Sequence, residues 1–80
     1  MPIAFVLINT EPRFMEEVLK SLKTVEAVKE AHTTYGIHDI IAKVEAETVD
    51  ELNEVVTQQI RKLNNVRSTL TMMVIEQMPD

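Results

Sequence analysis

Residues 3–8 form an uninterrupted apolar run, Ile-Ala-Phe-Val-Leu-Ile, close to the start of the chain. The run is too short for a helix and is rich in branched and aromatic side chains, which favours a strand. Because side chains alternate between the two faces of a strand, both faces of this one are apolar. We therefore expect residues 3–8 to form a central strand that is buried on both faces.

A helix is expected after this strand. Thr10 offers a capping hydroxyl, Pro12 suits a first helical turn, and apolar residues then recur at helical spacing with charged residues between them. We predict an amphipathic helix over roughly residues 11–24. Its inner stripe would consist of Met15, Val18, Leu19, Leu22 and Val25.

Two further strands are expected around the only glycine. Residues 28–35 have the β-branched and aromatic content of a strand, and residues 40–46 largely alternate with the period of a half-buried strand. Gly36 lies between them, so we predict a hairpin closed by a loop over residues 36–39.

The second half of the chain predicts another helix and a last strand. Thr48 and Glu51 have the spacing of a capping box, in which each satisfies a backbone donor of the other. Asn64 and Asn65 follow as a helix stop, because asparagine tolerates the left-handed conformation. The last strand is expected over residues 66–76 and becomes apolar on both faces in its second half. The inner stripe of the helix would be Val49, Leu52, Val55, Val56, Ile60 and Leu63.

The predicted order is β-α-β-β-α-β, the pattern of a ferredoxin-like α+β sandwich with a four-stranded antiparallel sheet and two helices on one face. The face without helices would expose a large apolar patch in a single chain, since the first and last strands are apolar on both faces. We therefore expect sheet-to-sheet dimerisation. A mass of one chain in native mass spectrometry at micromolar concentration would contradict this.

The composition supports one small domain that associates with other copies. The chain has 80 residues, 45% of them hydrophobic, so we expect a single domain over residues 1–80 with a small core. It contains no cysteine, and therefore neither a disulfide nor a thiolate zinc site can reinforce that core. Self-association is the reinforcement that we expect.

The charge balance excludes several classes of partner. The net charge is −5 and no basic run is longer than Arg61-Lys62, which argues against direct nucleic-acid binding and against attraction to anionic lipid. The longest apolar stretch, residues 3–8, is too short for a membrane span, and no signal peptide is recognisable. We therefore expect a cytoplasmic protein.

No motif for catalysis, metal binding or a cofactor is recognisable. One glycine cannot build a phosphate-binding loop, and Ser21 and Ser68 lie in no nucleophile motif. His32 and His38 lack the spacing of a three-ligand metal site, and the five methionines fit a core or a dimer interface. We expect no enzyme activity, no metal and no cofactor.

Asp39 stands apart from the other acidic residues, most of which are interleaved with lysine as solvated charges usually are. It lies three residues after Gly36 and beside His38, at the end of the hairpin where backbone donors are free. Two interpretations stay open from the residues alone. Asp39 is either a turn carboxylate that hydrogen-bonds its own loop or part of a site for the ammonium and carboxylate groups of an amino acid.

Three blocks of the sequence carry a resemblance to a known family. They are residues 4–8 (Ala-Phe-Val-Leu-Ile), 35–40 (Tyr-Gly-Ile-His-Asp-Ile) and 63–71 (Leu-Asn-Asn-Val-Arg-Ser-Thr-Leu-Thr). In this order, with a G-x-x-D motif in the hairpin, they resemble the effector-binding RAM domain of the Lrp/AsnC family of feast/famine regulators. The match runs nearly end to end, and Asn65 departs from the glycine of many members.

The resemblance implies sheet-to-sheet dimers in a dimeric α/β barrel-like assembly, which join into rings such as octamers. It also implies small effectors, usually amino acids, bound between dimers, with the hairpin loop as one wall and the start of the last strand supplying polar contacts. Tyr35 would pack beneath the pocket. The ligand-binding residues carried over by position are Tyr35, Gly36, Ile37, His38, Asp39, Arg67, Ser68 and Thr69.

Full-length members carry an N-terminal helix-turn-helix domain, of which this sequence has no counterpart. If Met1 is the true start, the chain resembles the stand-alone form, which cannot bind DNA itself and acts by co-assembly with full-length regulators. We therefore expect an amino-acid-sensing oligomerisation module involved in transcription regulation. The alternatives are a small dimeric ferredoxin-like enzyme, which would need a deep cavity lined by His32 and a carboxylate, and a structural adaptor without a ligand.

Overall fold

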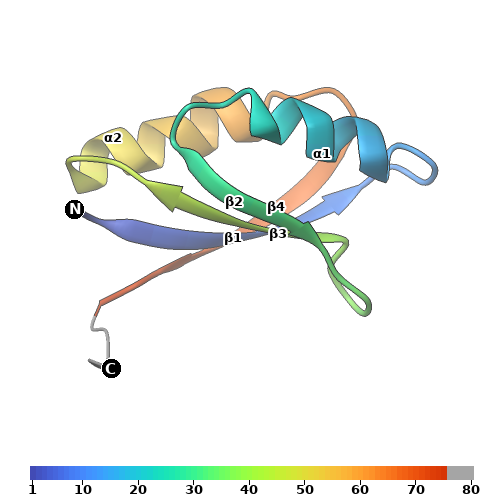
Figure 1. Cartoon of the computed structure of the whole chain (residues 1–80), viewed down its shortest axis with the longest axis horizontal. Helices are drawn as coiled ribbons and strands as arrows, with labels where there is room; N and C mark the ends of the chain where they lie inside the picture. Colours follow the sequence, from blue (N-terminus) through green and yellow to red (C-terminus); the bar gives the residue numbers. More distant parts are fainter. Residues whose placement is uncertain (76–80) are drawn as a thin grey trace.

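The computed structural model describes residues 1–75 and contains one four-stranded antiparallel sheet with the strand order β2-β3-β1-β4 (Figure 1). The ferredoxin-like order predicted from the sequence is confirmed, with β1 in the centre of the sheet and β4 at an edge. The elements are β1 (Ile3–Thr10), α1 (Met15–Lys23), β2 (Val28–Thr33), β3 (Ile40–Glu45), α2 (Val49–Glu54), a π-helical segment η1 (Val55–Ile60) and β4 (Val66–Met73).

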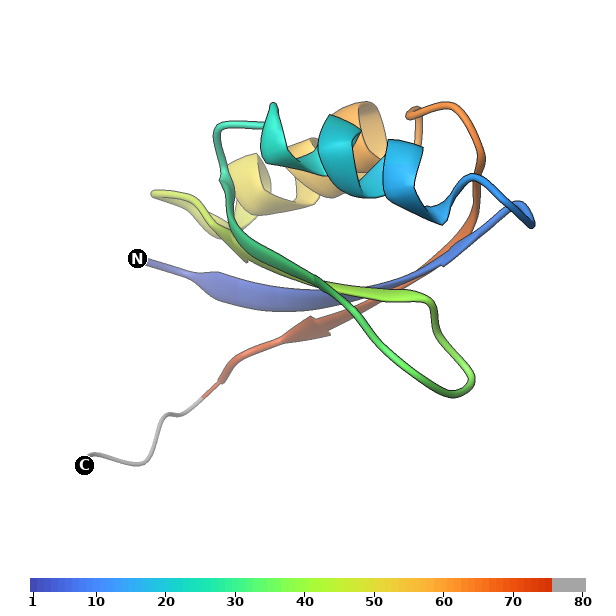
Figure 2. The ribbon, with the colours of Figure 1, turned by 45° about the vertical axis from the view of Figure 1, so that its right-hand side comes forward.

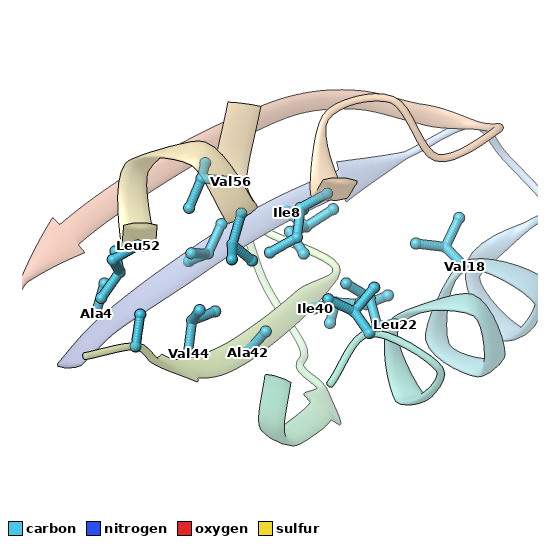
Figure 3. Close-up of a cluster of buried hydrophobic side chains, with 14 residues drawn as sticks. Ala4, Ile8, Val18, Leu22, Ile40, Ala42, Val44, Leu52 and Val56 are labelled. Carbon is cyan, nitrogen blue, oxygen red and sulfur yellow. The ribbon is translucent and has the colours of Figure 1, made fainter. Parts of the chain in front are cut away.

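The core lies between the sheet and the two helices, which cover the same face (Figure 2). Alternate residues of β1 and β3 point into it, and α1 contributes two fully buried residues, Val18 and Leu22 (Figure 3). This pattern follows from the period of two in the strands and the helical spacing in α1. The buried apolar strand residues are Ala4, Val6, Ile8, Ile40, Ala42 and Val44.

The start of the first helix differs from the prediction. Helix α1 begins at Met15 rather than near residue 11, and its N-cap residue, Phe14, makes no side-chain capping bond. Thr10 is the last residue of β1, and its hydroxyl bonds to Asp39 instead of capping a helix. The capping prediction was wrong because a side chain 29 positions away uses this hydroxyl.

The second helix begins as predicted and then widens. The backbone N–H of Glu51 donates to the Thr48 hydroxyl at 3.0 Å, which confirms that Thr48 is the cap. Three buried residues of this segment are spaced four apart: Leu52, Val56 and Ile60. In an α-helix of 3.6 residues per turn, each such residue would be rotated by about 40° around the helix axis relative to the previous one. The π-helical turn of η1 reduces that rotation. Val49, predicted on the inner stripe, is 49% exposed.

Two strands also end earlier than predicted. Strand β2 ends at Thr33 rather than at residue 35, and β4 ends at Met73, while the predicted end of the last strand at Glu76 lies outside the described residues. Asn65 has a φ of 71°, so the predicted left-handed stop before β4 is confirmed.

The second face of the sheet carries no helix among residues 1–75 (Figure 2). On this face Leu7 lies opposite Leu70 and Phe5 lies opposite Met72. Leu70 is 51% exposed and Met72 is 47% exposed. We call this surface the open face. In the described part of the chain, none of the helices is long and apolar enough to span a membrane.

Candidate functional site

The loop between β2 and β3 projects beyond the end of the sheet (Figure 1). Two hydrogen bonds close it: the Thr34 hydroxyl donates to the His38 carbonyl at 2.6 Å, and the Thr34 N–H donates to the Asp39 carbonyl at 2.8 Å. Gly36 has a φ of 140°, a conformation that side chains rarely adopt, which explains a glycine here. Tyr35 is fully exposed in the single chain, so packing beneath a pocket formed between dimers stays a prediction.

Asp39 connects this loop to the end of β1. Its N–H donates to the Ile8 carbonyl at 3.0 Å, and its Oδ2 accepts bonds from the Thr10 N–H at 2.9 Å and the Thr10 hydroxyl at 3.3 Å. The carboxylate therefore bonds to a neighbouring strand, not to its own loop as the turn interpretation required. Both side-chain bonds use Oδ2, so they leave Oδ1 for another donor.

A β-bulge brings Arg67 to the same end of the sheet. Asn9 pairs with Ser68 while Thr10 pairs with Val66, so Arg67 is the extra residue on β4. Bulges of this kind redirect side chains and are common beside binding sites. The Arg67 Nε lies 3.5 Å from the Glu11 Oε2, an ion pair whose members are 60% and 49% exposed.

A surface hollow of about 370 Å³ lies where the hairpin loop and the bulge meet. Four of the residues predicted from the sequence line it, together with two that the sequence interpretation did not select. Asn9 is one of the latter, and its side-chain Oδ1 is buried without a hydrogen-bond partner. The lining residues are Asn9, Thr10, Ile37, Asp39, Arg67 and Ser68.

A second hollow of about 390 Å³ lies beside the first and shares two of its residues. Thr69, the remaining predicted residue of β4, lines this second hollow. Its hydroxyl accepts a bond at 2.9 Å from the Nε of Arg61, which follows η1. The lining residues are Arg61, Val66, Arg67, Ser68 and Thr69.

The other predicted loop residues do not line either hollow. Gly36 and His38 lie in the same loop, and the His38 Nδ1 is buried without a partner. The sequence interpretation did not select Asn9, Thr10 or Arg61. Their positions depend on strand pairing and on the π-helical turn, and no local sequence motif predicts either feature.

The second histidine lies on the open face. The His32 Nε2 is 3.3 Å from the Glu30 Oε1, and the Lys43 Nζ is 3.8 Å from the Glu30 Oε2. The His32 and Glu30 side chains are more than half exposed and Lys43 is 27% exposed, and such solvent-screened contacts contribute little to stability. Across residues 1–75, no group of three or more His, Cys, Asp or Glu side chains has the arrangement of a metal site.

The comparison with protein families decides the assignment. The family model described as the Lrp/AsnC ligand binding domain matches residues 3–80. The chain belongs to the Lrp/AsnC family. This match covers the whole fold described above, including the hairpin loop, the bulge and both hollows.

Solved structures of this family have the same fold. FFRP-DM1 is 39% identical with a TM-score of 0.90, over 94% of this chain and 100% of that one. The hypothetical protein PHS023 from Pyrococcus horikoshii is 38% identical with a TM-score of 0.88, over 96% and 93%. AsnC from E. coli is 26% identical with a TM-score of 0.89, and the chain covers 52% of it.

More distant structures share the fold alone. Two of them are complexes with L-methionine: the transcriptional regulator NMB0573 from Neisseria meningitidis, 12% identical with a TM-score of 0.87, and the feast or famine regulatory protein Rv3291c from M. tuberculosis, 22% identical with a TM-score of 0.81.

The domain also occurs within enzymes. Homocitrate synthase from Saccharolobus solfataricus is 37% identical over 65 residues, which are 81% of this chain and 14% of the enzyme. The chain thus spans about one seventh of the curated relatives that it matches.

Proposed function

We propose that this chain is an amino-acid-binding module that assembles into dimers and rings and responds to its ligand by changing that assembly. The observation that carries the proposal is the hollow in which the Asp39 carboxylate and the Arg67 guanidinium line one surface. An amino acid at neutral pH presents one ammonium and one carboxylate group. A carboxylate and a guanidinium in one hollow are the complementary partners of this pair.

Asp39 is suited to the ammonium group. Its Oδ2 is held by two donors from Thr10, which fixes the carboxylate before a ligand arrives and reduces the entropy lost on binding. Ser68 would add a hydroxyl for the ligand carboxylate beside Arg67. Ile37, which is 88% exposed, would contact the side chain of the ligand.

The open face supports the dimer in this proposal. Its apolar side chains are complementary to a second copy of themselves, and a two-fold axis would place the same patch on both partners. The exposed loop tip, with Tyr35 and Ile37, would then meet a neighbouring dimer and close the hollow from outside. A ring such as an octamer is one such arrangement.

Ligand binding at a boundary between dimers would shift assembly, because a ligand favours the state that it binds more tightly. The module would do no chemistry itself and would act in the cytoplasm. Co-assembly with full-length Lrp/AsnC regulators would link it to transcription, as the family membership of residues 3–80 supports.

A second partner is favoured by one specific observation, the homocitrate synthases that contain a related segment. The same module could report an amino-acid level to a metabolic enzyme rather than to a DNA-binding regulator. Mixing the purified chain with each candidate partner and measuring the masses of the complexes distinguishes the two, since only the true partner forms mixed oligomers.

Calorimetry against the twenty amino acids, paired with native mass spectrometry, tests the proposal. We expect at least one selective ligand, a change in oligomer mass when it binds, and a loss of affinity of ten-fold or more in Asp39→Asn. Asp50→Asn is the matched control, because Asp50 is an exposed aspartate in the first turn of α2. If no amino acid binds and no mass changes, the proposal is wrong.

A further inference from the structure

Two of the three arginines of this acidic chain meet at one surface hollow. The net charge is −5, yet Arg61 and Arg67 both line the hollow of about 390 Å³ beside β4. Ser68 and Thr69 add two hydroxyl groups to the same surface. Guanidinium and hydroxyl groups are donors suited to a carboxylate, and among residues 1–75 no carboxylate lines this hollow.

Arg61 is held at this position by two separate features. Its N–H donates to the Val56 carbonyl at 2.9 Å, which completes the wide π-helical turn, and its Nε donates to the Thr69 hydroxyl at 2.9 Å. A π-helical turn rotates the chain less per residue than an α-helical turn, so η1 changes the direction in which Arg61 leaves the helix. Such turns are frequent at functional sites.

Arg67 lies on β4, where it is the extra residue of the β-bulge, and it lines both hollows. The two hollows are neighbours that share Arg67 and Ser68. Only Arg67 and Ser68, the residues that both hollows share, therefore separate a ligand in the Asp39 hollow from the second cationic surface.

Two acidic groups of the chain oppose an anionic ligand here. Glu11 lies 3.5 Å from Arg67, and Asp39 lines the neighbouring hollow. The ion pair of Glu11 and Arg67 is half-exposed, so solvent weakens it and a carboxylate of the ligand can replace Glu11 at modest cost. Asp39 would instead pair with the ammonium group of the ligand.

We propose that Arg61 is a further binding residue and that the effector is an amino acid with an acidic side chain. The inference rests on the proposed function. The ligand ammonium pairs with Asp39, its α-carboxylate with Arg67, and its side-chain carboxylate with Arg61. The chemical class is therefore an acidic amino acid, of which glutamate and aspartate are the simplest members.

Calorimetry with matched ligand pairs tests this inference. Glutamate and glutamine differ in one group, as do aspartate and asparagine, so their affinity ratio isolates the side-chain carboxylate. We expect the acid to bind at least ten-fold more tightly than the amide in the unchanged protein. The ratio should fall close to one in Arg61→Gln and be partly retained in Arg61→Lys, which keeps the charge but not the planar fork.

Lys62→Gln is the matched control, since it removes one positive charge from the adjacent residue, which lines neither hollow. It should leave the ratio within two-fold of the unchanged protein. Glu11→Gln should raise the affinity for the acid, because it removes the competitor of the ligand at Arg67. Thermal unfolding of each variant shows that it is folded.

The outcomes separate this inference from the proposed function. Amide ligands that bind as tightly as acids, or a preference for the acid that survives Arg61→Gln and Arg61→Lys, overturn the inference and leave the proposed function intact. If no amino acid of any class binds, both fall.

Discussion

The two faces of the sheet are formed by the same strands but are covered differently. On the helix face, Val6 and Ile8 of β1 are completely buried by α1, α2 and η1. On the open face, Leu70 and Met72 of β4 remain about half exposed. An apolar run in the sequence therefore predicts that both faces of the strand are buried. It does not predict whether residues of the same chain or of another chain bury them. Helices of the chain cover one face, and we propose that a second copy covers the other.

The largest expected effect concerns the covered face. Ile8→Ala should reduce the free energy of unfolding by about 2–5 kcal/mol, because it leaves a cavity in a closely packed core. Urea unfolding monitored by circular dichroism measures this loss, which should be similar at every protein concentration. Leu7→Ala, one residue earlier and on the open face, is the control. Its effect should grow with protein concentration, since it weakens association. If both variants lose the same free energy of unfolding at every protein concentration, the proposed difference between the two faces is wrong.

A charge on the open face should prevent association. Leu70→Glu introduces a carboxylate on each partner directly opposite Leu7, so a sheet-to-sheet dimer would bury two unpaired charges. We expect a mass of one chain in native mass spectrometry, where the unchanged protein gives two or more. Gln58→Glu adds the same charge on the exposed side of η1 and should leave the mass unchanged. A dimer that persists in Leu70→Glu would place the interface elsewhere.

Asp39 lies at the end of the sheet, beside the candidate site. Asp39→Ala leaves the Thr10 N–H without its partner and should cost about 1–3 kcal/mol of stability. Thermal unfolding measures the change, and Asp50→Ala on the exposed first turn of α2 provides the comparison. A loss no larger than that of Asp50→Ala would mean that Asp39 does not hold the loop to β1.

The smallest effect is expected at Asn65, in the turn that leads from the helix layer to β4. With a φ of 71°, this residue is left-handed, so Asn65→Ala should cost about 1 kcal/mol, while Asn65→Gly should change stability by less than about 0.5 kcal/mol. Chemical denaturation resolves both values. A glycine variant that is less stable than the alanine variant would show that the asparagine side chain, and not the backbone conformation, matters here.

Most of the fold could be predicted because its signals are local and periodic. The alternation of β3, the helical spacing of α1 and the left-handed Asn65 each depend on a few neighbouring residues. The start of α1 could not be predicted, because capping preferences depend only on residues close in the sequence. The Thr10 hydroxyl bonds instead to Asp39, which is 29 positions away.

The candidate site was predictable only in part, for the same reason. Asp39, Arg67 and Ser68 belong to recognisable sequence blocks and do line one hollow. Arg61 carries no motif, and its place at the second hollow depends on the π-helical turn and on Thr69 eight residues later. Tyr35 belongs to the same block as Asp39 yet lies at an exposed loop tip, since membership of a block does not determine burial.

The most direct test of amino-acid binding at this end of the sheet is a crystal structure of the protein grown with a mixture of amino acids at millimolar concentration. The account predicts density for one small molecule between the Asp39 carboxylate and the Arg67 guanidinium, in contact with Ser68. Density only at another place, such as the hollow lined by Glu26 and Glu51 at the far end of the molecule, or an empty Asp39 hollow, would contradict it.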